Sequence, residues 1–342
     1  MSSPNKSIGV AAKTAGLLFL LLSMTTCAAG TKESTVSTIA VQTSPQTEPG
    51  VISTTAPTAL PPTPAATTAI ESVGPCGQPG PAPPTYDHVI WIWMENKDRN
   101  QVFDSQHAPF MHRLAEMCGT ASNYVDHGIH PSLPNYIAAT SGGTQGVSDD
   151  GSPRAHPLRV DNTFRQVRAI GKVSRSYEEA MLSNCSLQST GRYAVKHNPA
   201  AYFVDGDDRT ACQRDNVAFD QFLPDLASGL PDFALITPDI CNDTHDCAVA
   251  TGDQWLQDVV SGITDSATYH GGRTAIFIVF DESEGVGTLP FIAIAPSIRA
   301  GTNADVELDH YSLLAFTEDA LGIATRLGQA ANATSMADAF GL

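Results

Sequence analysis

Hydrophobic positions along the chain are concentrated in short runs that predict buried strands. The first run, residues 86–94, is an almost unbroken series of β-branched and aromatic residues. Such a run is typical of a strand in a parallel sheet that is covered on both faces. Similar strands are predicted at residues 233–237, 274–280 and 290–295, and a weaker one at residues 172–177.

Between these runs the spacing of apolar residues changes to that of helices. Residues 108–117, 253–263 and 312–321 each carry apolar side chains three and four positions apart, which predicts helices with one buried face. Because strands and helices alternate throughout, the pattern predicts an α/β fold. We expect a three-layer α/β/α sandwich, with a mostly parallel central sheet and helices on both sides.

Acidic and amide residues follow three of the predicted strands. Glu95 and Asn96 come directly after the first strand, residues 238–246 follow another, and Asp281 and Glu282 follow a third. Ligands bind at the carboxyl ends of the strands in open α/β sheets. A carboxylate after a strand is common in turns, so each position alone is a weak signal. Three such strand ends together predict a set of oxygen ligands at one edge of the sheet.

The stretch HPSLPNY at residues 130–136 is the most specific in the chain. A helix that begins here would hold the Ser132 hydroxyl at a helix N-terminus, where backbone N–H groups and the helix dipole favour an anion. Ser132 could then act as a nucleophile, and Asn135 could donate to a phosphoryl oxygen. The alternative is purely structural, with Ser132 as an N-cap and Pro134 as a first-turn proline.

The N-terminal part of the chain has the pattern of an exported protein. Residues 1–26 combine Lys6 and Lys13 with a short apolar run and then small residues, which predicts a signal peptide. Cys27 follows in a sequence similar to a bacterial lipobox and is a candidate for lipidation; ordinary secretion is the alternative. Residues 27–75, rich in Thr, Ser and Pro, predict a disordered tether. The catalytic domain is expected at residues 76–342.

The charge of the chain limits its partners. Without the two leader lysines, 17 basic side chains face 36 acidic ones, which gives the mature chain a formal charge of −19. Such a charge argues against nucleic acid as a partner. A phosphate site in so acidic a protein needs local positive charge, which a metal ion would supply. The chain has seven cysteines, and lipidation of Cys27 would leave six, enough for three disulfides in an oxidising compartment.

Several short blocks, in order along the chain, resemble a bacterial phosphoesterase family that contains secreted acid phosphatases and phospholipases C. This family is part of the alkaline-phosphatase-like superfamily. The blocks are MEN (94–96), HPSLPNY (130–136), YAVKHNP (193–199), PDICNDTHDC (238–247), TGDQWL (251–256), FDESEG (280–285) and DHYSLL (309–314). The resemblance implies an alkaline-phosphatase-like fold, and it is greater to the compact acid phosphatases than to the phospholipases.

The resemblance also implies roles for individual residues. Ser132 looks like the nucleophile, and Glu95, Asn96, Asp281 and Glu282 look like the ligands of a divalent metal ion. The shell around the phosphate would be formed by His130, Asn135, His197, Asp243, His245, Asp246 and His310. Of these, His197 and His310 are the candidates for protonating the leaving group, with His197 favoured. Asp243, His245 and His310 would suit either a second metal ion or a metal-free phosphate clamp.

The metal and the disulfides follow from the same residues. Oxygen donors alone favour Mg²⁺, Ca²⁺ or Mn²⁺, while Zn²⁺ or iron becomes more favourable if histidines join them. Cys241 and Cys247 bracket the loop with Asp243 and His245, and Cys185 and Cys212 bracket the loop with His197. Cys76 and Cys118 then form the third pair.

These observations predict a secreted, metal-dependent acid phosphatase that hydrolyses phosphate monoesters through a phosphoserine. We expect a lipid anchor on the outer face of a bacterial membrane, and a small phosphorylated molecule or a phospholipid as substrate. A phospholipase C-type phosphodiesterase is the alternative enzyme, since it needs the same nucleophile and metal. A non-catalytic, lipid-anchored binding protein is the alternative from another class.

Overall fold

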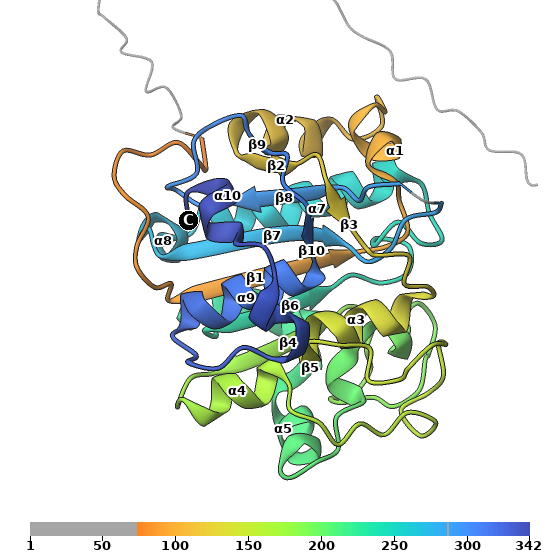
Figure 1. Cartoon of the computed structure of the whole chain (residues 1–342). Coiled ribbons are helices and arrows are strands. Elements are labelled where there is room, and N and C mark those ends of the chain that lie inside the picture. Colours follow the sequence, from red (N-terminus) through yellow and green to blue (C-terminus); the bar gives the residue numbers. More distant parts are fainter. Residues whose placement is uncertain (1–73, 286) are drawn as a thin grey trace, which may run out of the picture. The chain divides into compact units, whose positions relative to one another are not determined.

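The computed structural model describes residues 74–285 and 287–342, which form an α/β domain built on one large sheet. Its strands are β1 (His88–Met94), β2 (Gly119–Ala121), β4 (Ser174–Glu178), β5 (Asn216–Ala218), β6 (Phe233–Thr237), β7 (Thr274–Phe280), β8 (Phe291–Ile294) and β9 (Thr302–Ala304). Their order is β5-β4-β6-β1-β7-β8-β2-β9 (Figure 1). The five strands from β5 to β7 are parallel, and β8 is antiparallel to its neighbours. A separate parallel pair joins β3 (Tyr124–Val125) to β10 (Leu308–Asp309).

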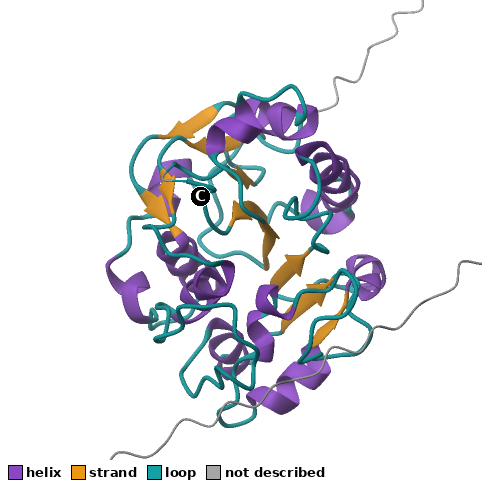
Figure 2. Cartoon of the chain, turned by 90° about the vertical axis from the view of Figure 1, so that its right-hand side faces the viewer, coloured by secondary structure: helices purple, strands orange, loops and turns teal. Residues whose placement is uncertain are grey.

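Helices cover both faces of the sheet (Figures 1 and 2). The α-helices are α1 (Arg99–Phe103), α2 (Pro109–Met117), α3 (Ser132–Ser141), α4 (Thr163–Ala169), α5 (Asp208–Asp215), α6 (Phe222–Ser228), α7 (Val249–Thr264), α8 (Ala267–His270), α9 (His310–Leu321) and α10 (Met336–Phe340). Short 3₁₀ turns are η1 (Val195–His197), η2 (Pro199–Ala201), η3 (Phe219–Gln221) and η4 (Gly328–Asn332). Helices α3, α4 and α9 pack together on one face, and α2 packs with α7 on the other.

Strand β1 lies at the centre of the sheet and fixes the position of α3. Trp91 and Trp93 are buried on this strand. Trp91 donates a hydrogen bond from its indole nitrogen to Thr317 Oγ1 of α9 at 3.0 Å, and the Trp93 ring packs 5.1 Å from the Tyr136 ring of α3. Burial of a large apolar side chain stabilises a fold by about 1.5–3 kcal/mol. These contacts hold the N-terminal half of α3 against the carboxyl end of β1.

The predicted fold is confirmed, and the long strands match their predicted positions. Strands β6 and β7 have the predicted bounds, and β1 begins two residues later than predicted. Helix α7 is longer than predicted at its N-terminus, where it begins at Val249. The sequence did not predict β2, β3, β5, β9 or β10, because strands of two or three residues are too short to show a hydrophobic period.

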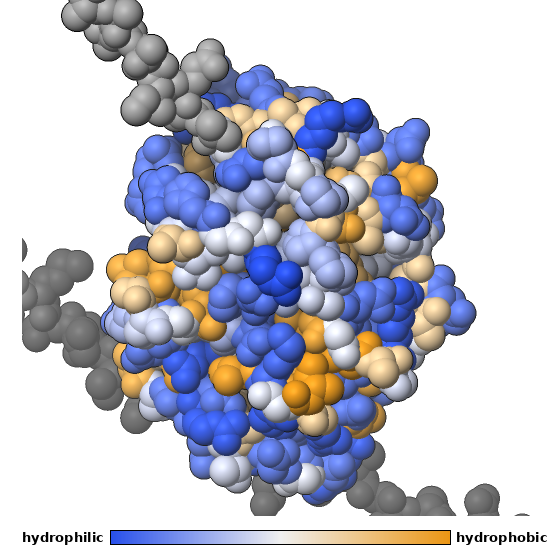
Figure 3. Space-filling model, turned by 90° about the vertical axis from the view of Figure 1, so that its left-hand side faces the viewer, coloured by the Kyte–Doolittle hydropathy of each residue, from blue (hydrophilic) through white to orange (hydrophobic). Residues whose placement is uncertain are grey.

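The edge of the sheet at the carboxyl ends of the parallel strands differs from the edge at their amino ends in the loops and side chains that lie there. The strands β1 and β7 end on the right in Figure 1, and Figure 2 looks onto this edge, where many loops gather. Figure 3 shows the opposite edge, where hydrophilic and apolar side chains are mixed. The connection from α4 to β4 lies at that edge and exposes Ile170 and Val173.

Three disulfides join the described cysteines with the predicted pairing: Cys76–Cys118, Cys185–Cys212 and Cys241–Cys247. The predicted signal peptide (1–26), the lipidation candidate Cys27 and nearly all of the predicted tether lie outside the described residues. Within residues 74–285 and 287–342, no helix is both long enough and apolar enough to span a membrane.

Candidate active site

The ends of β1 and β7 bring the predicted oxygen ligands together. The two strands are parallel, with Met94 level with Phe280, so Glu95 and Asp281 leave the sheet side by side. The Asn96 backbone N–H donates to Asp281 Oδ1 at 3.0 Å. In the amide orientation that satisfies its neighbours, the Asn96 side chain also donates to Asp281 Oδ1 and to Glu95 Oε2, both at 3.0 Å. Three of the four predicted metal ligands therefore form one cluster.

Ser132 is the first residue of α3, and its hydroxyl points into this cluster. Ser132 Oγ donates to Glu95 Oε2 at 3.0 Å, and the residue is buried. The N-cap position belongs to Pro131, whose side chain makes no capping hydrogen bond. The alternative in which Ser132 is an N-cap is therefore wrong. We call Ser132, Asn96 and Asp281 the nucleophile side of Glu95.

His197, Asp243 and His245 lie on the other side of the same carboxylate, and we call them the histidine side. His197 is buried, with Nε2 3.3 Å from Glu95 Oε2 and Nδ1 3.3 Å from Asp243 Oδ2. Neither nitrogen makes a hydrogen bond with any residue of 74–285 or 287–342. The His197 ring stacks on Tyr136, with ring centroids 5.5 Å apart. Ligand atoms of Glu95, His197 and His245 lie within 4.8 Å of one another.

The buried charges of the site repel one another. Burial, with the nearby charges of Asp281 and Asp243, raises the pKa of Glu95 well above its usual range. Burial likewise raises the pKa of Asp281, and that of Asp243 to about 8. Burial lowers the pKa of His197 well below its usual value. Buried carboxyl groups packed around a neutral imidazole are unfavourable in their charged form unless cations offset that charge.

This donor set fits a divalent metal ion. The unpaired nitrogens of His197 and the unpaired Asp243 Oδ2 are buried ligand atoms that make no hydrogen bond within the described residues. Neutral imidazole and carboxylate are the groups that zinc and iron accept, while the nucleophile side offers oxygen and suits harder ions. Glu95 is common to both sides. His197, predicted as a proton donor, thus has the surroundings of a metal ligand.

The fourth predicted metal ligand, Glu282, belongs to a neighbouring cluster. Its Oε2 lies 2.8 Å from His130 Nδ1 and 3.5 Å from Asn135 Nδ2. Burial first, and the charge of Asp281 second, raise the pKa of Glu282 to about 8. Asn135 Nδ2 also donates to the Ile129 carbonyl at 2.7 Å, and its buried Oδ1 has no hydrogen-bond partner in the described part of the chain. His130 and Asn135 are therefore near the nucleophile, as predicted, with Glu282 linking them.

The remaining predicted residues are peripheral to the cluster. His310 is buried with both ring nitrogens engaged, 2.7 Å from the Asp281 carbonyl oxygen and 3.1 Å from the Tyr124 hydroxyl. It therefore supports the backbone of Asp281. Asp246 is largely exposed and lies 2.7 Å from His245 Nδ1, so it orients the imidazole.

Two residues of the site were missed by sequence reasoning. The Tyr136 hydroxyl donates to Glu95 Oε1. Its position four residues after Ser132 was a usable signal, because residues i and i+4 share a helix face. Lys196 Nζ lies 3.3 Å from His245 Nε2. Burial acts to lower the pKa of Lys196, but the charges of Glu95 and Asp150 outweigh it and raise the pKa above its usual value.

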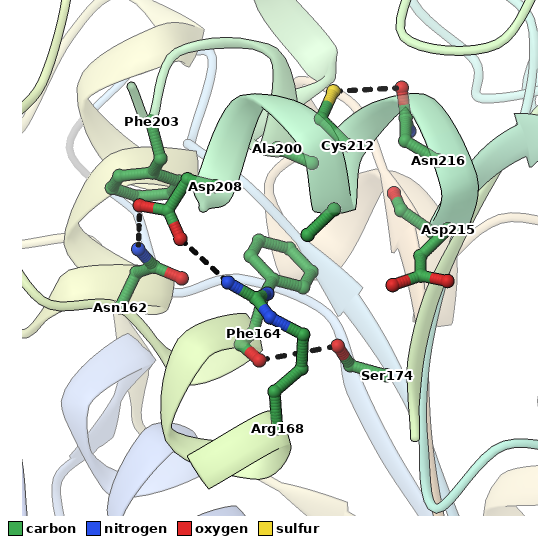
Figure 4. Close-up of a pocket in the computed structure, with 12 residues that line it drawn as sticks. Asn162, Phe164, Arg168, Ser174, Ala200, Phe203, Asp208, Cys212, Asp215 and Asn216 are labelled. Atoms are coloured by element: carbon green, nitrogen blue, oxygen red, sulfur yellow. Dashed lines mark hydrogen bonds and ion pairs between the residues drawn. The ribbon is translucent and has the colours of Figure 1, made fainter. Parts of the chain in front are cut away.

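A separate pocket lies beneath α5, where Arg168 and Asp208 are paired with each other (Figure 4). Asp208 is buried there and accepts from Asn162 Nδ2 at 3.1 Å and from Arg168 at 2.7 Å. Because none of the predicted site residues lines this pocket, we place the active site at the Glu95 cluster.

Comparisons with known proteins show what the chain is similar to. A sequence model of the Phosphoesterase family matches residues 88–324. The chain is similar to a phosphatidylinositol-3-phosphatase of Mycobacterium tuberculosis, at 27% identity over 75% of this chain and 84% of that protein. It is also 27% identical to an acid phosphatase of Aspergillus fumigatus, over 67% of this chain but only 54% of the fungal protein. The chain thus spans little more than half of that relative.

Solved structures share the fold at low sequence identity. A member of the alkaline phosphatase superfamily from Vibrio parahaemolyticus superposes with a TM-score of 0.51 at 10% identity, over 74% of this chain and 72% of that one. At this identity the likeness shows the fold alone.

Proposed function

The chain belongs to the Phosphoesterase family and is a phosphoric ester hydrolase, and from this premise we propose that it is an acid phosphatase with Ser132 as its nucleophile. The observation that carries the proposal is the buried Ser132 hydroxyl at the start of α3, 3.0 Å from Glu95 Oε2. A hydroxyl there is close to the carboxyl groups of Glu95 and Asp281 and lies at a helix N-terminus, which together suit attack on a phosphoryl group.

In the proposed reaction, Ser132 Oγ forms a bond to phosphorus as the bond to the leaving oxygen breaks. The Ser132 proton passes to the surrounding carboxylates, while Asn135, whose Nδ2 donates to the Ile129 carbonyl, positions the start of α3 rather than the phosphate. His130, whose ring is 41% exposed at the mouth of the site, supplies the proton of the leaving oxygen. Water then cleaves the phosphoserine and regenerates Ser132, with release of inorganic phosphate.

A divalent ion is part of the proposal. Glu95 would hold it, with Asn96 and Asp281 or with His197, Asp243 and His245 as partners. A metal ion at such a site lowers the pKa of a bound hydroxyl and offsets the charge that develops on phosphorus. His197 acts here as a ligand, in place of the predicted proton donor, because its two ring nitrogens face two carboxylates.

The expected location of the protein also remains a proposal. Export through the signal peptide at residues 1–26 and lipidation of Cys27 would place the domain outside a bacterial membrane, with small phosphate monoesters or phospholipid head groups as substrates. The phosphatase relatives support a monoesterase over a phospholipase C-type diesterase. The acid phosphatase named among them supports an optimum on the acid side of neutrality.

A substrate panel with and without chelator tests the proposed function. The purified domain should hydrolyse an aryl phosphate monoester faster than the corresponding diester or phosphatidylcholine. Exhaustive chelation should abolish turnover, and one divalent ion should restore it, with elemental analysis giving its identity. Full activity in the chelated, metal-free protein would refute metal dependence, and faster hydrolysis of the diester would favour the diesterase.

A further inference from the structure

Lys196 is a cation at the site, and its side chain is mostly buried. It has no role in the mechanism described above. It precedes His197 on η1, and its side chain is 22% exposed. Its ammonium lies between two partners: Nζ donates to Asp150 Oδ2 at 3.1 Å and to His245 Nε2 at 3.3 Å. Lys97, the other lysine near the cluster, donates instead to Glu284 and to the Asn96 carbonyl.

Asp150 holds this ammonium beside the nucleophile helix. Its Oδ2 accepts from Lys196, and its Oδ1 accepts from the backbone N–H of Leu133 at 3.1 Å. Leu133 directly follows Ser132, so one carboxylate links the ammonium to the first turn of α3. The ammonium is therefore held at the N-terminus of α3, beside Ser132.

The contacts of Lys196 are of a kind that a phosphate can replace. Asp150 has a side chain 30% exposed, and an ion pair open to water contributes only about 0–1 kcal/mol. A dianionic phosphoryl group brought next to the ammonium offers a stronger, charge-assisted hydrogen bond. His245 Nε2, the other acceptor, takes the hydrogen bond from Lys196 as a neutral imidazole nitrogen.

We propose that Lys196 is a substrate-binding residue whose ammonium contacts a non-bridging phosphoryl oxygen and selects monoesters over diesters. The inference rests on the proposed function and deepens it. A monoester dianion has three non-bridging oxygens and two negative charges, whereas a diester has two such oxygens and one charge. With the nucleophile side and the helix N-terminus each holding one oxygen, the ammonium holds the third, which only the monoester has.

The experiment compares Lys196→Met with the matched control Lys172→Met. Lys172 is 30% exposed and pairs with Asp232 at 2.7 Å, but it lies at the amino edge of the sheet, away from Ser132. Calorimetry would measure the affinity for inorganic phosphate, and kinetics would give kcat/KM for an aryl phosphate monoester and its diester. Elemental analysis would give the metal content of each protein.

Loss of a charge-assisted hydrogen bond corresponds to a change of about 10- to 100-fold. We therefore expect phosphate affinity and monoester kcat/KM to fall by that factor in Lys196→Met, with the diester changed less than about threefold. Metal content should stay constant, and Lys172→Met should match the wild type. An unchanged affinity of Lys196→Met for phosphate would overturn the proposal. An equal fall in kcat/KM for both esters, together with loss of metal, would also overturn it.

Asp150→Asn gives a second test, of opposite sign. The amide keeps an acceptor for the Leu133 N–H but no longer competes as an anion for the ammonium. Phosphate affinity should rise severalfold in the wild-type background and rise less in Lys196→Met, which a double-mutant cycle measures. An equal effect in both backgrounds would overturn the proposal even if Lys196→Met folds poorly. If the wild type binds phosphate through Lys196 but hydrolyses no monoester, the proposed function fails and the binding site stands.

Discussion

The nucleophile side and the histidine side of Glu95 are held in different ways. On the nucleophile side, Asn96 and Asp281 directly follow the central strands β1 and β7, and Ser132 begins a ten-residue helix. On the histidine side, the residues lie on a 3₁₀ turn and on a loop without regular structure. Both of these segments are bracketed by disulfides, Cys185–Cys212 and Cys241–Cys247.

Two consecutive carboxyl groups support the histidine side from below. Glu179 accepts hydrogen bonds from Asp239 N–H, Asn242 Nδ2 and Trp255 Nε1 at 2.9–3.1 Å, and so holds the loop that carries Asp243 and His245. Its neighbour Glu178, the last residue of β4, supports the other segment through a buried chain of hydrogen bonds.

That chain reaches the backbone beside His197. Asn216 Nδ2 donates to Glu178 Oε1 at 3.1 Å, and Asn198 Nδ2, directly after His197, donates to Asn216 Oδ1 at 2.8 Å. The difference between the sides is thus one of support: packed helices and strands on one side, and side-chain hydrogen bonds and disulfides on the other. Regular elements are rigid through many small contacts, while irregular backbone depends on a few identifiable groups.

The largest expected effect is on the nucleophile side. Ser132→Ala should lower turnover by at least about 1000-fold, because it removes the attacking oxygen. The thermal unfolding temperature should change little, since α3 remains packed through Tyr136 and the apolar core. Ser228→Ala, on the surface helix α6, is the control. Turnover within tenfold of the wild type would exclude Ser132 as the nucleophile.

The disulfides can separate stability from activity. By loop-closure entropy, Cys76–Cys118, with a sequence separation of 42, should stabilise the fold by about 4 kcal/mol, and Cys241–Cys247, with a separation of 6, by about 2 kcal/mol. Replacement of Cys76 and Cys118 by serine should therefore cost more stability and little activity. The same change at Cys241 and Cys247 should cost less stability but lower turnover about tenfold or more. Denaturant titrations and kinetics on both variants measure this contrast, and the reverse order would contradict it.

Glu179→Gln should weaken the histidine side alone. The amide nitrogen introduced at position 179 is a donor and would face two other donors, the Asp239 N–H and the Asn242 amide. The 239–247 loop therefore loses part of its hydrogen bonding to Glu179. We expect turnover to fall by about tenfold and metal to be released at lower chelator concentration, with little change in global stability. Trp255→Phe removes one donor only and should have a smaller effect. Equal effects of the two variants would show that Glu179 has no special role in positioning the loop.

The residues of the nucleophile side could be predicted from the sequence better than the contacts of the histidine side. Glu95, Asn96 and Asp281 could be identified because they end strands with strong hydrophobic runs, and Ser132 because it opens a distinctive stretch. The contacts of His197 could not, because they depend on loop backbone that no periodicity describes. Asn96 and Thr244 have φ of 42° and 80°, values in the left-handed region that non-glycine residues seldom adopt, and nothing in their local sequence indicated this.

The strands and helices could be predicted from the sequence to a greater extent than the hydrogen bonds that support the histidine side. Four of the five parallel strands, and the helices α2, α7 and α9, were predicted from hydrophobic spacing. Glu179 and Trp255 are 76 positions apart, and their hydrogen bond exists only because β4 and α7 meet in the folded domain. Such pairs arise from tertiary packing, which single-sequence patterns do not encode.

The smallest expected effect is the pH dependence of stability that comes from the buried Glu178. Burial raises the pKa of this carboxyl to about 8, whereas an exposed glutamate in the unfolded chain ionises near 4.5. Below pH 4.5 the group is protonated in both states, so its contribution to stability is fully present. As the pH rises from 4.5 towards 8, the unfolded chain loses the proton while the folded chain retains it, so stability is progressively lost.

Glu178→Gln should remove this pH dependence, because the amide fills the same space and cannot ionise. The variant should unfold at the same temperature as the wild type at pH 4.5, and a few degrees higher at pH 8. Thermal unfolding of both proteins at pH 4.5, 6 and 8 measures the difference, and the low-pH comparison is the internal control for packing. A constant difference across this range would mean that Glu178 does not keep its proton in the fold. A difference in unfolding temperature that widens with pH would show that Glu178 is a neutral carboxylic acid in the folded protein. The hydrogen-bond network that supports the histidine side would then be most stable at acid pH.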